Sequence, residues 1–106
     1  MKEITYSQKG SQMGDLKGVL RIIGKLLYFK FNNNQYAQQV VAQLQAKGAI
    51  INLGKGWIRV DMFRDLEEVR LGEKEFNTKK TSDEEIEELL HDFYINHFKK
   101  SGFKIE

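Results

Sequence analysis

Residues 19–31 constrain the fold of this chain most strongly, because two apolar runs flank the pair Gly24-Lys25. A glycine in the first position suits a two-residue type II′ turn, which joins antiparallel strands. We therefore predict a β-hairpin that pairs Leu20 with Phe29. A helix is the alternative, but Gly24 and three β-branched residues disfavour it.

The predicted hairpin has one apolar face and one mixed face, because the side chains of a strand alternate between the two sides of a sheet. We expect the apolar face to lie on the core. That face comprises Leu20, Ile22, Leu27, Phe29 and Phe31. The mixed face comprises Val19, Arg21, Ile23, Leu26, Tyr28 and Lys30.

Residues 49–62 show the same pattern around a second glycine-first pair, Gly54-Lys55. A turn at this pair places Ile51 opposite Ile58 and predicts a second hairpin. Its expected core face comprises Ala49, Ile51, Leu53, Ile58, Val60 and Met62. Its other face comprises Asn52, Trp57, Arg59 and Asp61.

Residues 35–47 have the spacing of an amphipathic helix, with apolar side chains on one stripe and glutamines mostly away from it. An asparagine of the preceding run Asn32–Asn34 is expected to cap this helix by accepting a backbone N–H bond. Gly48 is expected to end it.

Residues 82–100 form the second predicted helix. Ser82 is the expected cap, and three acidic residues follow it at the positive end of the helix dipole. Gly102 is expected to stop the helix. The expected buried stripe comprises Ile86, Leu89, Leu90, Phe93 and His97, with Tyr94 at its edge.

The rest of the chain carries weaker signals. Residues 2–8 alternate enough to predict an edge strand, and residues 9–18 are rich in glycine and polar side chains, which favours a loop. Residues 64–71 fit either a short helix or a strand, and residues 72–81 resemble a charged loop. Together the segments predict one α+β domain spanning residues 1–106, with an antiparallel sheet of two hairpins and two helices packed on it.

Charge is distributed unevenly along the chain. Residues 1–60 contain nine basic and two acidic side chains, a net charge of +7, whereas residues 61–106 contain eight basic and thirteen acidic ones, a net charge of −5. Such asymmetry is typical of proteins that present a basic surface to nucleic acid. Attraction between the two halves of one packed domain is the alternative explanation.

The residues that most enzyme chemistry requires are missing or poorly placed. The chain has no cysteine, which removes thiol catalysis, disulfides and cysteine-ligated metals. No serine lies in a G-x-S-x-G elbow, and no Walker motif occurs. Glu88 and His91 form one Glu-x-x-His motif, but a di-iron site needs a second such motif and further carboxylates. We therefore predict a non-catalytic protein with no metal and no cofactor.

Nothing in the sequence indicates export or membrane insertion. Residues 1–10 lack the apolar segment of a signal peptide. The longest apolar stretch, around residues 20–31, is too short and too charged to cross a bilayer. The absence of cysteine fits a reducing compartment. We expect a cytoplasmic protein that makes no membrane contact.

The strongest candidate site is the mixed side of the two hairpins, where aromatic and basic residues alternate. Aromatic rings stack on unpaired bases, and lysine and arginine hold phosphates. The pattern predicts binding of single-stranded nucleic acid by Arg21, Lys25, Tyr28, Lys30, Lys55, Trp57 and Arg59. The alternative is that the second helix or a second subunit covers this side, which would make Trp57 an ordinary core or interface residue.

A second hypothesis concerns the acidic start of the second helix. Its carboxylates, Glu84, Glu87 and Glu88, would present a negative face to a basic groove on a protein partner, as expected of a small inhibitor or adaptor of the phage or mobile-element type. Exposed strand edges also favour self-association as a homodimer.

Overall fold

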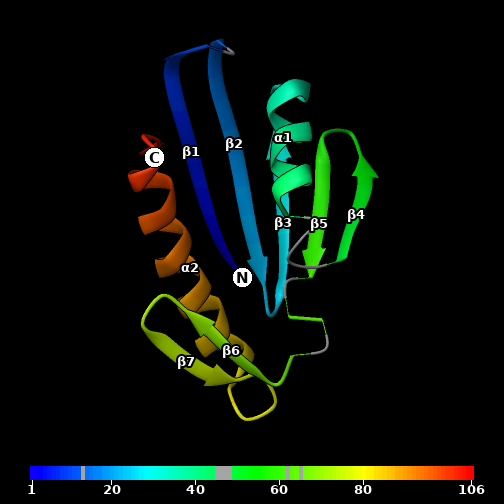
Figure 1. Ribbon diagram of the computed structural model, residues 1–106, viewed down its shortest axis with the longest axis vertical. Helices are drawn as coiled ribbons and strands as arrows, with labels where there is room; N and C mark the ends of the chain where they lie inside the picture. The colour runs from blue at the N-terminus through cyan, green and yellow to red at the C-terminus, as the bar shows by residue number, and fades with distance from the viewer. Residues whose placement is uncertain (13, 45–48, 62, 65) are drawn as a thin grey trace.

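The computed structural model describes residues 1–12, 14–44, 49–61, 63–64 and 66–106. The elements are β1 (Lys2–Ser11), β2 (Gly14–Ile23), β3 (Leu26–Phe31), α1 (Asn34–Leu44), β4 (Ala49–Gly54), β5 (Trp57–Asp61), β6 (Glu68–Leu71), β7 (Lys74–Asn77), α2 (Asp83–Lys100) and β8 (Lys104–Ile105). Figure 1 shows their arrangement. The prediction of an α+β chain with an antiparallel sheet and two helices, one of them long, is confirmed.

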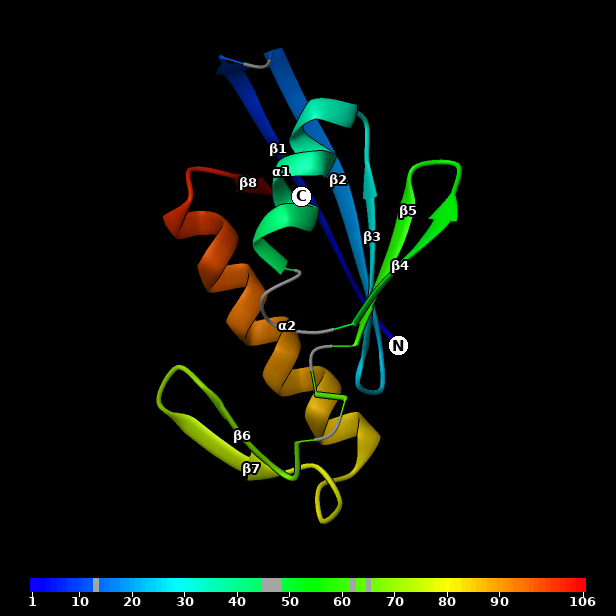
Figure 2. The same cartoon turned by 45° about the vertical axis from the view of Figure 1, so that its right-hand side comes forward.

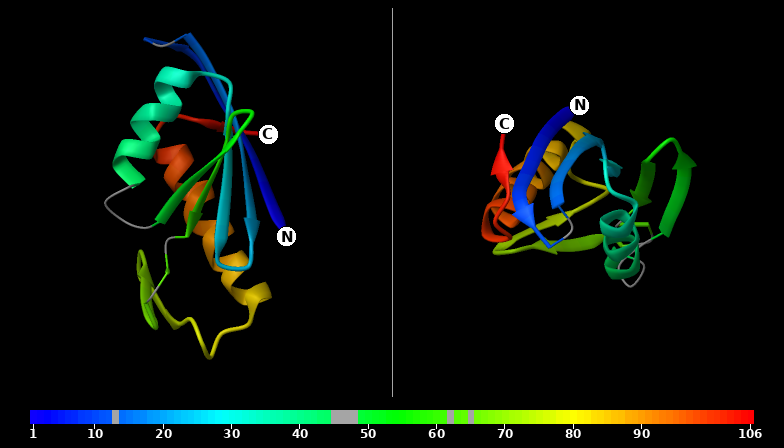
Figure 3. Two further views of the ribbon diagram at one scale, coloured as in Figure 1. Left: turned by 90° about the vertical axis from the view of Figure 1, so that its right-hand side faces the viewer. Right: turned by 90° about the horizontal axis from the view of Figure 1, so that it is seen from above.

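Six strands form one antiparallel sheet in the order β4-β5-β3-β2-β1-β8, and β6 pairs with β7 as a separate two-stranded sheet. The main sheet thus contains more strands than the two predicted hairpins. Both helices and the β6–β7 hairpin lie on one side of this sheet (Figures 2 and 3). We call that side the inner face, and the opposite side, over which none of the described helices lies, the outer face.

The predicted hairpin of residues 19–31 is confirmed as β2 and β3. Leu20 lies opposite Phe29, and Gly24 begins the turn with a φ of 58°, which glycine adopts without steric cost. All five residues of the predicted core face are buried, whereas those of the mixed face are exposed or only partly buried.

The register predicted for the second hairpin is wrong by one residue. Lys55 and Gly56 form the turn, and Gly54 pairs with Trp57. Three successive residues from Gly54 have positive φ, so the turn forms one position later than a glycine-first turn would. Leu53, predicted to lie in the core, is 50% exposed.

The pairings of β4 also differ from the prediction, since Ile50 lies opposite Val60 and Asn52 opposite Ile58. On β5, by contrast, Ile58 and Val60 are buried as predicted. The pairing of β5 with β3 fixes this orientation independently of the turn. Met62 lies outside the described residues.

Residues 9–18, predicted as a loop, belong largely to a long hairpin. β1 pairs with β2 from Lys2 opposite Ile22 to Ser11 opposite Gly14. β1 is also not an edge strand, because the short strand β8 pairs with it on its other side. The glycines that suggested a loop have other roles, the clearest of which is at Gly18.

Gly18 leaves room for an aromatic ring on the inner face. It is buried and lies opposite Tyr6, and a Cβ on Gly18 would lie 2.7 Å from Cε2 of Tyr6 and closer still to Cζ and Oη. The Tyr6 ring therefore crosses the backbone of β2. It stacks on Phe98 of α2 with ring centroids 4.0 Å apart.

Of the helix and the strand considered for residues 64–71, the strand forms at Glu68–Leu71, and the loop predicted for residues 72–81 contains a second strand, Lys74–Asn77. β6 and β7 pair around a turn at Gly72, which has a φ of 62°. Val69, Leu71 and Phe76 are buried in the common hydrophobic core. The apolar alternation of two four-residue strands is too short to be recognised reliably in a sequence.

Helix α1 begins close to the predicted position. Asn33 caps it, because its side-chain oxygen accepts a bond of 2.9 Å from the backbone N–H of Tyr36. The described helix ends at Leu44. The predicted end at residue 47 and the stop at Gly48 lie outside the described residues.

Helix α2 has the predicted ends but a rotated buried face. Ser82 caps it, and Gly102 follows its last turn with a φ of 87°. The buried side chains are Ile86, Glu87, Leu90, Tyr94 and Phe98. His97, predicted on the buried stripe, is exposed, because Tyr94 and Phe98 occupy the contact with the aromatic residues of the sheet.

No helix in the described part of the chain is long and apolar enough to cross a bilayer.

Candidate functional site

The outer face of the sheet carries the predicted aromatic and basic residues in two adjacent rows. Successive strand pairings align Arg21 with Tyr28 and Tyr28 with Arg59 in one row. The next row aligns Lys30 with Trp57. Cross-strand partners point to the same side of a sheet. We call the five residues Arg21, Tyr28, Lys30, Trp57 and Arg59 the basic-aromatic face.

Trp57 is the centre of this face. Its ring is partly buried, with the Cζ atom of Arg21 at 4.9 Å from the ring centroid and Nζ of Lys30 at 5.6 Å. Both distances are within the range of cation–π attraction. The cations that would neutralise phosphate are therefore adjacent to the ring that would stack on a base.

An acidic residue that was not predicted at this site contacts it. Glu3 of β1 lies opposite Arg21 of β2. The Glu3 carboxylate accepts a hydrogen bond of 2.8 Å from the Nε atom of Arg21. Both side chains are nearly half exposed, so the ion pair is solvated and weak. Glu3 positions the guanidinium over the indole and also competes for it with any incoming anion.

The structure does not bring all seven predicted residues together. Lys25 lies in the β2–β3 turn, at the opposite end of the sheet from the β4–β5 turn that contains Lys55 (Figure 1). Lys55 is exposed and close to Trp57 in sequence. Lys25 lies five positions before Lys30, a span of roughly 16 Å along an extended strand. Lys55 therefore lies at the end of the sheet where Trp57 begins β5, whereas Lys25 lies at the other end.

The acidic residues of α2 do not form the exposed triad that the sequence suggested. Glu84 and Glu88 are exposed, and Glu88 pairs with Lys2 at 3.6 Å. Glu87 is buried instead, where it accepts a hydrogen bond of 2.8 Å from the backbone N–H of Gly24 and pairs at 3.2 Å with the amino group of Met1. Glu87 therefore anchors α2 to the β2–β3 turn.

The environment of Glu87 changes its ionisation. The backbone hydrogen bond from Gly24 lowers the pKa of its carboxyl group below the usual value, and the amino group and Lys2 act in the same direction. Burial acts in the opposite direction but does not reverse the shift.

The inner face holds a cleft that sequence reasoning missed. It has a volume of about 280 Å³ and lies between α1, α2 and the sheet. Its walls include Tyr6, Phe31, Tyr36 and Phe103, which come from three separate parts of the sequence. Burial raises the pKa of the Tyr6, Tyr36 and Tyr94 phenols above the usual value. The sequence signal was the density of aromatic residues, which we interpreted only as core.

Neither histidine lies in a group of metal ligands. Nδ1 of His91 lies 3.7 Å from Oδ1 of Asp92. Over the described residues, no three His, Asp or Glu side chains gather closely enough to hold a metal ion.

Comparisons of the chain with family models, with curated proteins and with solved structures gave no significant match.

Proposed function

We propose that this chain is a non-catalytic module that binds single-stranded DNA or RNA through the basic-aromatic face. The observation that carries the proposal is the position of Trp57 on the outer face, where Arg21 and Lys30 lie over its ring. The C-terminal helix, which would have excluded this function by covering the indole, packs on the inner face (Figure 3).

The residues of the basic-aromatic face divide into two chemical roles. Trp57 and Tyr28 supply rings, each of which adds about 1–3 kcal/mol when a base stacks on it. Arg21, Lys30 and Arg59 supply positive charge for phosphates, and Lys55 extends it toward the turn. A single strand is the expected ligand, because only unpaired bases expose a ring face for stacking.

The acidic residues at the start of α2 are not part of the basic-aromatic face, whereas Glu3 contacts it. The acidic start of α2 lies at the β2–β3 turn, where Glu87 accepts the bond from Gly24, at the opposite end of the sheet from the β4–β5 turn (Figure 1). Glu84 and Glu88 therefore do not compete with phosphate for the basic-aromatic face.

The hypothesis of a protein partner on the acidic helix is the weaker proposal. It retains two exposed carboxylates, Glu84 and Glu88, but loses Glu87 to an internal contact. Reversing the charge of Glu84 and Glu88 would abolish such an interaction and leave nucleic-acid binding intact, so the two proposals give opposite results.

The proposal is tested by fluorescence anisotropy with a short labelled oligothymidylate. Three to four phosphate contacts at about 0.7 each predict a slope of about −2 to −3 for log affinity against log salt. Affinity should therefore fall about 20- to 50-fold between about 50 and about 200 mM salt. Trp57→Ala should weaken binding about 5- to 150-fold, as expected for one lost stacking contact.

Matched variants separate the two roles. Trp57→Ala should leave the salt slope unchanged, whereas Lys30→Ala should reduce it by about 0.7. Lys99→Ala, which removes an exposed positive charge from α2, should change neither the affinity nor the salt slope. Unchanged affinity in Trp57→Ala would refute the stacking site. A homodimer closed over the outer face would instead appear in light scattering as a doubled mass, with Trp57 shielded from a soluble quencher.

A further inference from the structure

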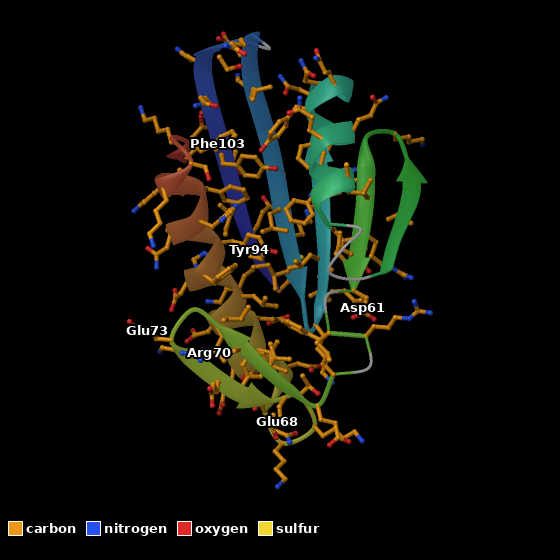
Figure 4. The ribbon with its side chains drawn as sticks, viewed as in Figure 1. Asp61, Glu68, Arg70, Glu73, Tyr94 and Phe103 are labelled. Atoms are coloured by element: carbon orange, nitrogen blue, oxygen red, sulfur yellow. The ribbon has the colours of Figure 1, made fainter. Side chains whose placement is uncertain are left out.

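The aromatic cleft on the inner face has the features of a small-molecule site. Its volume of about 280 Å³ lies near the lower end of the range for ligand pockets. The labelled residues Tyr94 and Phe103 in Figure 4 belong to its wall. The lining comprises Tyr6, Phe29, Phe31, Tyr36, Gln39, Tyr94, His97, Phe98, Ser101 and Phe103.

The walls of the cleft come from rings that brace one another. Tyr36 of α1 meets Phe31 edge-on with centroids 5.4 Å apart and lies 5.9 Å from Phe103. Tyr6 stacks on Phe98 and meets the edge of Phe103 at 5.4 Å. Rings held in this way keep an aromatic space open in advance of binding, which reduces the entropy cost of accepting a flat molecule.

The Tyr6 hydroxyl gives the cleft an unused hydrogen-bond donor. Tyr6 is 1% exposed, and its hydroxyl has no hydrogen-bond partner among the described residues. A phenylalanine would make the same ring contacts without burying a polar atom. Burying the unpaired hydroxyl therefore costs folding free energy for which the ring contacts give no reason.

The direction of the Tyr6 side chain places this donor toward the cleft. The end of the ring crosses Gly18 of β2, and Gly18 lies opposite Phe31 of β3. The hydroxyl thus points from β1 toward the side of the cleft formed by Phe31 and Tyr36. Tyr36 adds to the effect of burial in raising the pKa of the Tyr6 phenol, which agrees with this proximity.

We propose that the cleft binds a small planar aromatic molecule that carries a hydrogen-bond acceptor. This acceptor would accept a hydrogen bond from the Tyr6 hydroxyl. An engineered apolar cavity of about 150 Å³ accommodates benzene, so a space nearly twice as large accommodates two fused rings. The ring edges and faces of the wall favour an aromatic ligand over a branched aliphatic one. The site lies on the opposite side of the sheet from Trp57 and is independent of the proposed nucleic-acid binding.

Quinoline and naphthalene form the probe pair, because they have the same shape and only quinoline carries an acceptor nitrogen. At neutral pH quinoline should bind about 2- to 10-fold more tightly than naphthalene, the range of one net hydrogen bond. Tyr6→Phe should remove this preference and leave the affinity for naphthalene unchanged. Tyr36→Phe, the same chemical change at a neighbouring ring, should keep it.

Amide chemical shifts provide the second readout, which does not depend on any variant folding. Quinoline should shift the amides of Gly18, Phe31 and Ser101, while the indole N–H resonance of Trp57 stays in place. Shifts centred on Trp57, equal affinity for the two probes in the unmodified chain, or no binding of either probe at millimolar concentration would each overturn the proposal.

Discussion

Gly18→Ala tests the packing of the sheet with a single added methyl group. Gly18 lies in β2 opposite Tyr6, and its Cβ would lie 2.7 Å from Cε2 of Tyr6 and closer to Cζ and Oη. Cβ atoms essentially never approach other heavy atoms closer than 3.0 Å, so the ring would have to move. On its other side the ring stacks on Phe98 and contacts Phe103, and these two contacts limit its movement away from Gly18.

The expected cost follows from this confinement. An added methyl group in a well-packed core destabilises a protein by about 1–3 kcal/mol. For a chain of this size, that corresponds to a fall in melting temperature of about 5–20 °C. Unfolding followed by circular dichroism in urea and on heating measures both quantities. Lys17→Ala, at the exposed neighbouring position of β2, should change stability by less than about 0.5 kcal/mol.

A second substitution shows whether the Tyr6 ring causes the effect. Tyr6→Leu replaces the ring with a shorter side chain that does not reach over Gly18, and by itself it lowers the free energy of unfolding. In the Tyr6→Leu background Gly18→Ala should cost less than about 0.5 kcal/mol, so the two changes are coupled by about 1–3 kcal/mol. Additive effects, or a Gly18→Ala variant as stable as the unmodified chain, would show that the phenol does not lie over Gly18.

Two further predictions concern carboxylates. Glu3→Gln frees the Arg21 guanidinium and should raise affinity for oligothymidylate about 1.5- to 5-fold in the anisotropy assay, the range of one exposed ion pair; lower affinity would show that Glu3 mainly positions Arg21. Glu87→Gln weakens the charged hydrogen bond to Gly24 and should cost about 1–3 kcal/mol at neutral pH in urea unfolding. Because the pKa of Glu87 is lowered in the folded state, this contribution is fully present above the usual carboxyl pKa and is lost as pH falls through the lower folded value, so the two proteins should converge in stability in acid. A difference in stability that does not narrow as the pH is lowered would contradict this.

Local signals in the sequence predicted those elements that depend mainly on near neighbours. The β2–β3 hairpin forms around Gly24, and the faces of both strands follow from simple alternation. Asn33 and Ser82 cap their helices because the asparagine or serine oxygen reaches a backbone N–H three residues later.

The features that the sequence did not reveal depend on distant contacts. β8 is a two-residue strand that exists only because β1 offers a free edge. The buried face of α2 is set by the position of Tyr6, which draws Phe98 inward and leaves His97 exposed. Glycines led to two wrong predictions. Gly18, which suggested a loop, accommodates a ring inside a strand, and the glycines around Lys55 shift a predicted turn by one residue.

The candidate site shows the same division. Strand alternation alone placed Trp57 and Arg59 on the outer face, and the pairing of β5 with β3 gives them that position despite the error in the β4–β5 turn. Nothing local could reveal that Lys25 lies at the far end of the sheet or that Glu3 contacts Arg21 from β1. The aromatic cleft requires both helices to be in place, so no single segment predicts it.

The intrinsic fluorescence of Trp57 offers the most direct measurement, since the chain contains a single tryptophan. Titration with unlabelled oligothymidylate at low salt should quench this emission in a saturable manner, with the same affinity as in the anisotropy assay, and added salt should reverse it. Anisotropy that reports binding while the tryptophan emission stays constant would mean that nucleic acid contacts the protein elsewhere. That result, or the absence of any binding at about 50 mM salt, would contradict the proposal that the outer face of the sheet stacks on bases.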